Sequence, residues 1–192
     1  MDLYLLCEAR KEDRTFLVVI DQHAAHERIL FENLKKQFYA DRMPSQNLLF
    51  PKMLELPPES GETLAKNRVE IRRLGILVEE FGGDHYIIKA VPSAVSHLDP
   101  EEILSGILAG FSADDYGHNE TKKQADATRF DDILSTMACK AAVKAGRDLS
   151  FEEIAQLLKL MEESSAFTHC PHGRPVMRMF SDAEIKKWFR RT

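Results

Sequence analysis

The sequence of 192 residues contains no long apolar run, few cysteines and no excess of basic residues. No stretch approaches the roughly 20 apolar residues that a membrane-spanning helix needs. The first residues also lack the basic start and small-residue cleavage site of a secretion signal. Three thinly spread cysteines suit reduced thiols or metal ligands better than a disulfide framework. We therefore expect a cytoplasmic protein with no membrane partner.

The charge balance limits the kind of partner that the chain can bind alone. A formal net charge of −5 argues against a broad basic surface for nucleic acid, because Lys and Arg supply most non-specific affinity for phosphate. Any work on DNA would need help from another protein. With 44% hydrophobic residues the chain can bury a core, as one domain or as two small lobes.

The distribution of apolar residues predicts a mixed α/β (α+β) fold. A period of two residues indicates a half-buried strand, and spacings of three and four indicate an amphipathic helix. These patterns predict strands at 3–7, 16–20, 75–81 and 85–92, helices at 23–38, 59–74, 99–109 and 130–146, and extended stretches at 44–58 and 170–180. Residues 112–128 are polar and lack periodicity, so we expect a mobile loop there.

Two more helices are predicted from their start signals. Ser150 is followed three residues later by Glu153, and Ser181 by Glu184. This spacing is typical of a capping box, in which the serine and the glutamate each bond to the backbone of the other.

The residues that follow the second predicted strand can bind a metal ion. Asp21 comes directly after FLVVI, so its carboxylate would emerge at the carboxyl end of a strand, where open α/β sheets place ligand sites. His23 and Glu27 are four residues apart, which puts them on one helix face, close enough to chelate one ion. Alternatively, Asp21 is an ordinary N-cap and the other two are solvated surface residues.

Two further stretches offer thiolate and imidazole, side chains that proteins use for zinc and similar ions. In CPHGRP, Cys170 and His172 point to the same side if the segment is extended, and Pro171 would stiffen it. Cys139 lies in a predicted helix rich in small residues, where a neighbouring element can come close. Alternatively, Cys139 is a buried core thiol.

Together these stretches resemble the C-terminal domain of the bacterial DNA mismatch-repair protein MutL, of the type that carries a latent endonuclease. The family's DQHA, two residues, Glu, four residues, Glu pattern is met by Asp21, Gln22, His23, Ala24, Glu27 and Glu32. Its Ala-Cys-Lys/Arg element matches 138–140, and its Cys-Pro-His-Gly-Arg-Pro element matches 170–175. The elements occur in the family's order with similar gaps and cover essentially the whole chain.

The resemblance implies a metal-dependent endonuclease that nicks one strand of duplex DNA. It makes Asp21 the carboxylate most important for cleavage and Glu27 the residue best placed to bridge two ions. The implied zinc ligands are His23, Glu27, Cys139, Cys170 and His172. Asp21 would join the more weakly held manganese or magnesium ion that drives cleavage. Glu32 is expected to be structural or to orient ligands, whereas Lys140 and Arg174 would contact the scissile phosphate or pair with the acidic motif.

The QNLLFP stretch at 46–51 resembles the Gln-x-x-Leu-x-Pro peptide by which this family contacts the DNA sliding clamp. Leu49, Phe50 and Pro51 can enter an apolar pocket while Gln46 fixes the register by hydrogen bonds. Alternatively, the segment is a linker that packs on its own domain. A sliding clamp would also supply the DNA affinity that the acidic surface lacks.

The resemblance further implies a homodimer of two-lobed subunits. Residues 1–45 and 146–192 would form a dimerisation lobe from both chain ends, with an uncertain second boundary between 130 and 146. Residues 46–145 would form an inserted external regulatory lobe. The last helix and the first two strands are candidate interface, or else monomer core.

The chain is expected to be a piece of a longer bacterial protein, nucleoid-associated during repair. Its nucleotide-binding lobe and its contact with the mismatch-recognition protein would lie outside the sequence given.

Two other functions fit part of the pattern. One is a non-catalytic module for dimerisation and partner docking, in which zinc is only structural. The other is an unrelated zinc hydrolase that acts on a small molecule, which would leave several of the motifs unexplained.

Overall fold

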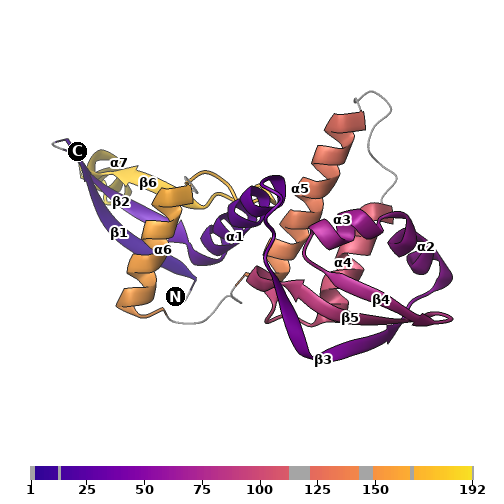
Figure 1. The fold of residues 1–192 in the computed structure, drawn as a ribbon. Helices are drawn as coiled ribbons and strands as arrows, with labels where there is room; N and C mark the ends of the chain where they lie inside the picture. The colour runs from indigo at the N-terminus through magenta and orange to yellow at the C-terminus, as the bar shows by residue number, and fades with distance from the viewer. Residues whose placement is uncertain (1–2, 13, 113–121, 143–148, 165–166, 192) are drawn as a thin grey trace. The chain divides into compact units, whose positions relative to one another are not determined.

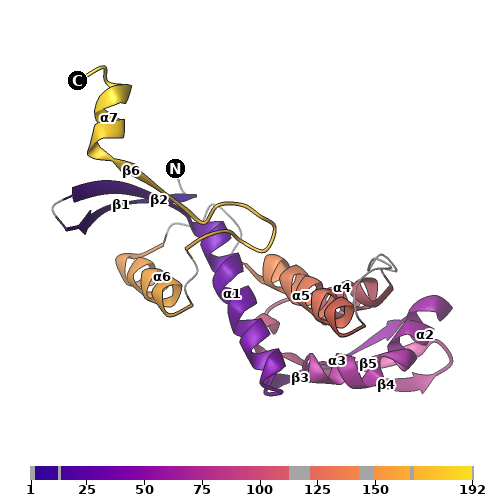
Figure 2. The same ribbon diagram turned by 90° about the horizontal axis from the view of Figure 1, so that it is seen from above.

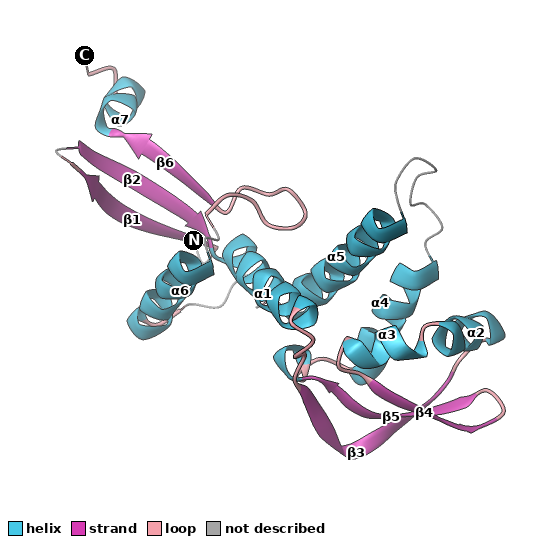
Figure 3. Cartoon of the chain, turned by 45° about the horizontal axis from the view of Figure 1, so that its top comes forward, coloured by secondary structure: helices cyan, strands magenta, loops and turns pink. Residues whose placement is uncertain are grey.

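The computed structural model describes the chain outside residues 1–2, 13, 113–121, 143–148, 165–166 and 192 (Figure 1). In chain order its elements are β1 (Tyr4–Lys11), β2 (Arg14–Asp21), α1 (Gln22–Tyr39), β3 (Ser45–Glu55), α2 (Pro58–Lys66), α3 (Arg68–Arg73), β4 (Leu77–Gly82), β5 (His85–Pro92), the 3₁₀ turn η1 (Ser93–Val95), α4 (Pro100–Ser112), α5 (Lys122–Ala141), α6 (Phe151–Ser164), β6 (Met177–Ser181) and α7 (Asp182–Trp188). The mixture of helices and small antiparallel sheets confirms the predicted α+β class (Figure 3). Among the described residues, no helix is long and apolar enough to cross a membrane.

The chain forms two compact units. The first consists of Met1–Leu30 together with Ala142–Thr192, and the second of Phe31–Ala141. The division therefore falls inside α1, whose first half belongs to one unit and whose second half belongs to the other. The change that the sequence placed at Ser45 coincides with the first residue of β3.

The first unit is built on an antiparallel sheet of order β1-β2-β6, with α7 following β6 at the sheet edge (Figure 2). Leu5 pairs with Ile20, and both side chains point to the face that α6 covers. Leu157 and Met161 of α6 complete this core. Burying each such side chain contributes roughly 1.5–3 kcal/mol, which fixes the hairpin against the helix. The opposite face of the sheet leaves apolar side chains exposed, among them Tyr4 and Leu6.

The second unit carries an antiparallel sheet of order β3-β5-β4, with α2, α3 and α4 gathered on one side of it (Figure 3). The predicted hairpin between β4 and β5 is confirmed. Its turn contains Gly82 and Gly83 at φ +106° and +59°, a backbone conformation that glycine adopts without the strain of a side chain. The predicted extended stretch at 44–58 is confirmed in large part as β3.

Both predicted capping boxes are present. The Ser150 N–H donates to Glu153 Oε2 at 2.8 Å, and the Glu153 N–H donates to Ser150 Oγ at 3.3 Å, at the start of α6. Ser181 and Glu184 repeat these contacts at the start of α7. Each box satisfies backbone donors that the first helical turn leaves without a partner.

The predicted single helix over 59–74 is wrong, because the chain forms two helices that are separated at Asn67. The side chain of Asn67 donates to the carbonyl of Thr63 at 2.8 Å. Its backbone takes φ −113° and ψ 23°, outside the helical region. An asparagine competes in this way for backbone hydrogen bonds, so it ends α2 although the apolar spacing continues.

The predicted loop over 112–128 is wrong in its last part, because α5 begins at Lys122. The first turns of α5 are polar and offer no apolar stripe, so periodicity cannot detect them. Residues 113–121 of that prediction lie outside the described residues, as do residues 143–146 of the helix predicted to end near Gly146.

Candidate metal centre

Glu27 is the centre of a cluster of possible metal ligands in the first unit. It lies on the first half of α1, and only 2% of its side chain is exposed. His23, one turn earlier, places Nε2 3.1 Å from Glu27 Oε1. His172 places Nδ1 3.8 Å from Glu27 Oε2. His23 and Glu27 therefore share one helix face, as their spacing predicts, and Glu27 is buried rather than solvated.

Cys170 and His172 belong to a tight turn, so the predicted extended conformation of this segment is wrong. The Gly173 N–H donates to the carbonyl of Cys170 at 2.9 Å, and Gly173 has φ +81°. The Cys170 N–H donates to the carbonyl of Arg174 at 2.8 Å. The chain reverses here, and only then continues into β6. Both side chains turn toward Glu27 because of this reversal, rather than because of the alternation of a strand.

The Cys170 thiol is buried beside the Glu27 carboxylate, with 3% of the residue exposed. Burial raises the pKa of Cys170 above its ordinary value, and the hydrogen bond and negative charge of Glu27 act in the same direction. Backbone hydrogen bonds from Arg174 and His172 act in the opposite direction. Without a metal ion, Cys170 is therefore a thiol that donates to Glu27. A bound cation would have to displace that proton.

Asp21 lies at the junction of β2 and α1. Its Oδ1 accepts a hydrogen bond from the Ala24 N–H at 3.0 Å, which confirms the interpretation of Asp21 as an N-cap. Its own N–H donates to the carbonyl of Val176 at 2.9 Å, which ties the junction to the segment that precedes β6. Asp21 is roughly 9 Å from Glu27 along the helix. Capping requires one carboxylate oxygen, so it does not exclude a chemical role for Asp21.

Arg28 also holds the turn in place, although no sequence pattern indicated it. Its Nη1 donates to the carbonyl of His169 at 3.2 Å. The two residues are 141 positions apart, and an arginine after an apolar helix start carries no signal of such a distant partner. This contact joins α1 directly to the segment that carries Cys170 and His172.

His26, the remaining histidine of α1, is held largely in its neutral form. Burial is the main cause that lowers its pKa, and the nearby His23 lowers it further. A backbone hydrogen bond with Gln22 and the charge of Glu153 act in the opposite direction.

Three predicted site residues belong to the second unit. Cys139 is half-buried on α5, and Glu32 is half-buried on the second half of α1. Lys140 extends its ammonium over α4, where Nζ lies 3.2 Å from the carbonyl of Glu102. Within this unit, Lys140 thus contributes to the packing of α5 on α4.

The predicted clamp-binding peptide lies on β3, an edge strand of the second sheet. Pairing with β5 is regular at Gln46, is interrupted after Asn47 and resumes at Lys52. Within this bulge, Leu49 is 87% exposed and Phe50 is 83% exposed. Large apolar side chains at such exposure are available to a partner and contribute little to the core of their own unit.

The residues gathered around Glu27 fit a divalent metal ion in their chemistry. Imidazole, carboxylate and thiolate are the ligands that zinc accepts, and thiolate in particular favours zinc over harder ions. An ionised carboxylate as buried as Glu27 is unfavourable unless positive charge or hydrogen bonds compensate it. The imidazole nitrogens of His23 and His172 face its two oxygens, and a cation between such groups would satisfy all three.

The fold and the site define an α+β domain with a mixed thiolate, imidazole and carboxylate cluster at the start of one helix. The family description "MutL C terminal dimerisation domain" matches residues 2–149. The chain therefore belongs to the MutL C-terminal domain family, whose members include DNA mismatch-repair proteins.

Relatives named DNA mismatch repair protein MutL match nearly the whole chain. The protein of Geotalea uraniireducens strain Rf4 is 42% identical over 188 residues, which cover 98% of this chain and 30% of the relative. That of Geobacter sp. strain M21 is 39% identical over 188 residues, covering 98% and 27%. That of Anaeromyxobacter dehalogenans strain 2CP-C is 41% identical over 184 residues, covering 96% and 29%. The chain thus spans less than a third of the length of these proteins.

Gly173→Ala is expected to weaken zinc binding by roughly 5- to 30-fold. An added methyl group would meet no atom within 4 Å at this position, so the effect comes only from the positive φ, which costs an L-residue about 1–2 kcal/mol. That strain would shift the turn away from the conformation that carries Cys170 and His172 to Glu27. Competition with a chelating dye measures the affinity.

Gly83→Ala is the matched control, because Gly83 also has a positive φ and open space but lies in the β4–β5 turn. It should lower the stability of its own unit and leave zinc binding unchanged. Equal loss of affinity in both variants would show that strain acts through general destabilisation.

Proposed function

We propose that this chain is the metal-dependent endonuclease domain of a mismatch-repair MutL protein, nicking one strand of duplex DNA, and that it also forms the homodimer. The observation that carries this proposal is the buried Glu27 carboxylate, enclosed by His23, Cys170 and His172 from two segments far apart in the chain. A cluster of this kind needs a positively charged partner, and a general structural role for the fold does not require it.

The proposed zinc ligands are His23, Glu27, Cys170 and His172, with Cys139 supplied by α5. When bound, such an ion supplies Lewis acidity and lowers the pKa of water at the site, and manganese or magnesium would serve the more oxygen-rich side. Glu27 bridges the ligand groups, because each of its oxygens faces an imidazole.

In the proposed hydrolysis, the oxygen of a water molecule forms a bond to phosphorus and one P–O ester bond breaks, which leaves a phosphate monoester and an alcohol. Asp21 supplies the carboxylate that orients this water and accepts its proton. The Ala24 N–H holds one Asp21 oxygen in place at 3.0 Å, which limits the positions open to the other. Arg174, exposed on the turn beside Cys170, is assigned to the scissile phosphate, which a guanidinium binds through two parallel hydrogen bonds.

The proposed partner that delivers DNA is the sliding clamp, bound by Gln46, Leu49, Phe50 and Pro51. The bulge on an edge strand supports this assignment, because it releases these residues from pairing and exposes two large apolar side chains. A net charge of −5 gives the chain little affinity for DNA by itself. The clamp would therefore supply the local DNA concentration that the surface of this chain does not.

The proposed dimer interface is the uncovered face of the β1-β2-β6 sheet together with α7. Tyr4 and Leu6 on β1 and Trp188 on α7 are large, apolar and exposed. Exposed apolar groups on a sheet face are typical of an interface, since burial against a second copy removes them from water.

A second candidate function is a dimerisation and docking module in which zinc is only structural. The deep burial of Cys170 favours it, because thiolate ligands are characteristic of structural zinc sites. The two functions differ in one observable, which is cleavage of DNA by a protein that holds its metal and forms its dimer.

The experiment that separates them incubates the dimer with supercoiled plasmid, manganese and a loaded sliding clamp. The proposed function predicts conversion of the plasmid to the open circle, abolished by a chelator. A Leu49→Ala/Phe50→Ala variant should lose the stimulation by the clamp at least about 10-fold, since loss of two apolar anchors costs more than 1.4 kcal/mol. Its stability should be unchanged because both side chains are exposed. Val69→Ala, another exposed apolar change in the same unit, is the control. A metal-loaded dimer that never nicks supports the docking module instead.

A further inference from the structure

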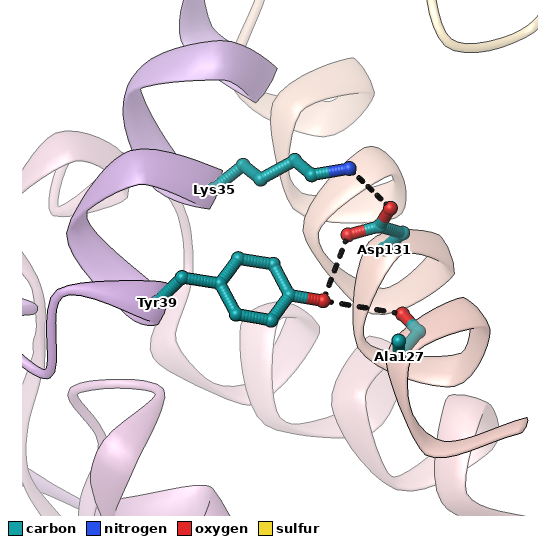
Figure 4. A network of polar contacts seen from close by, with 4 residues as sticks. All are labelled: Lys35, Tyr39, Ala127 and Asp131. Carbon is teal, nitrogen blue, oxygen red and sulfur yellow. Dashed lines mark hydrogen bonds and ion pairs between the residues drawn. The ribbon is translucent and has the colours of Figure 1, made fainter. Parts of the chain in front are cut away.

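A polar network joins the second half of α1 to α5 within the second unit (Figure 4). The Lys35 ammonium forms an ion pair with Asp131 Oδ2. The Tyr39 hydroxyl lies 3.2 Å from Asp131 Oδ1 and 3.4 Å from the carbonyl of Ala127. Partial burial and the contact with Asp131 raise the pKa of Tyr39, so the hydroxyl stays protonated and donates.

The contacts of this network fix how the two helices are aligned. Lys35 meets Asp131, and Tyr39, one turn later on α1, meets Ala127, one turn earlier on α5. The helices therefore run in opposite directions along a common contact (Figure 4). The rings of Phe38 and Phe130 pack beside the network with centroids 4.6 Å apart, which agrees with this alignment.

The network residues belong to rows that repeat every four residues. On α1 the row is Tyr39, Lys35, Phe31 and Glu27, and on α5 it is Ala127, Asp131, Ser135 and Cys139. Rows with this spacing form the ridges that interlock in the commonest class of helix packing, and they stay parallel even when the helix axes cross. The same number of turns leads from Lys35 to Glu27 as from Asp131 to Cys139, and both steps point the same way.

We propose that Lys35, Tyr39 and Asp131 are positioning residues that set the register of α5 on α1, so that Cys139 stands level with Glu27. This inference rests on the proposed function, because it assumes that Cys139 is a metal ligand. A slip of one helical turn would move Cys139 by about 5.4 Å, more than twice the length of a zinc–sulfur bond of about 2.3 Å. Aromatic packing alone tolerates such shifts, whereas hydrogen bonds and an ion pair are directional.

The exposure of the pair supports a role in alignment rather than in stability. The side chains of Lys35 and Asp131 are 37% and 31% exposed, and pairs of this kind add little to the free energy of folding. Lys35 also lies over the Phe31 ring at 5.5 Å, within the same row of α1. A cation that contacts both its own row and the facing row resists sliding of the two helices.

Cobalt substitution tests the inference without measuring DNA cleavage. Co²⁺ occupies the same nitrogen and sulfur sites as zinc, and each thiolate ligand adds a charge-transfer absorption. In the full chain, Asp131→Lys places two ammonium groups together and should weaken Co²⁺ binding about 10-fold, as changes to groups that orient ligands do. It should also lower the thiolate absorption toward that of Cys139→Ser. The reversed pair Lys35→Asp/Asp131→Lys should restore both.

The matched control is Glu79→Lys, which breaks the ion pair between Lys89 and Glu79 on β5 and β4. That pair has a distance of 2.5 Å and side-chain exposures of 41% and 46%, so its loss disturbs the same unit to a similar degree. Cobalt binding should be unchanged. If Asp131→Lys unfolds the unit, Asp131→Asn with Tyr39→Phe removes the network more gently, and the same spectral loss is expected.

The two ways to fail are distinguishable. A Cys139→Ser variant with an unchanged cobalt spectrum would show that Cys139 is not a ligand, which contradicts the ligand set of the proposed function. A Cys139→Ser variant that loses about half of the thiolate absorption, with unchanged spectra for Asp131→Lys and for Asp131→Asn/Tyr39→Phe, would overturn the positioning role alone.

Discussion

Asp21→Asn is expected to reduce metal-dependent nicking by about 100-fold or more, the range for loss of a general base. The amide carries no negative charge and cannot accept the proton of the attacking water. Its oxygen can still accept the Ala24 N–H that Asp21 Oδ1 accepts at 3.0 Å, and asparagine caps helices as well as aspartate does. The helix start should therefore survive the change. The measurement is the rate of open-circle formation with manganese and a loaded clamp.

Asp21→Ala separates the structural role of this residue from its chemical role. Alanine removes both the charge and the cap, so it should lower stability by about 1 kcal/mol in addition to the loss of nicking. Thermal unfolding and light scattering report stability and dimer formation for both variants. If Asp21→Asn nicks at the parental rate, Asp21 has only its capping role and the catalytic assignment fails.

The sequence predicted those parts of the site that depend on local geometry. His23 and Glu27 are one helical turn apart, and any α-helix places such a pair on one face. Asp21 was expected either as an N-cap or as a reactive carboxylate at a strand end, and the contact with Ala24 confirms the first of these. The two roles are compatible, so the local pattern alone could not decide the second.

The pairing of Cys170 with His172 was predicted from the wrong local conformation. Alternation along a strand places residues two apart on the same side, but the segment reverses in a turn instead. Pro171 and Gly173 are typical turn formers, the first through its fixed φ and the second through its positive φ, +81° in this structure. Weighing these two residues above the extended pattern would have predicted the turn.

Contacts between distant segments could not be predicted from any local pattern. The burial of Glu27 depends on His172 and Cys170, and the contact of Lys140 with Glu102 depends on how α5 packs on α4. Side chains of the same types occur on solvated helix faces, so composition gives no signal. Such contacts follow from the tertiary fold, which periodicity predicts only as a class.

Cys170→Ser is expected to weaken zinc binding by at least about 100-fold. Even groups that only orient ligands change affinity by about 10- to 100-fold, and loss of a thiolate ligand removes a direct bond to the ion. The Cys170 thiol is 3% exposed beside Glu27, so no water-filled space stands ready to replace it. Elemental analysis of purified protein should fall from at least one zinc per chain to less than half.

The same variant should lose the stabilisation that zinc gives to the fold. Metal at about 1,000 times its dissociation constant stabilises a folded protein by about 4 kcal/mol. Chelation should therefore lower the melting temperature of the parental chain by roughly 8–16 °C, at about 2–4 °C per kcal/mol for a chain of this size. Cys170→Ser should melt at the same temperature with and without the chelator.

Cys7→Ser provides the control within the same unit. Cys7 is a half-buried thiol on β1 that packs against the same core as Cys170, but it lies outside the cluster around Glu27. Its loss should leave both the zinc content and the response to chelation unchanged. If Cys170→Ser retains the parental response to the chelator, Cys170 is not a ligand. The raised pKa of its thiol would then reflect a hydrogen bond to Glu27 in a buried core, and the metal would have to be held by the imidazole and carboxylate groups alone.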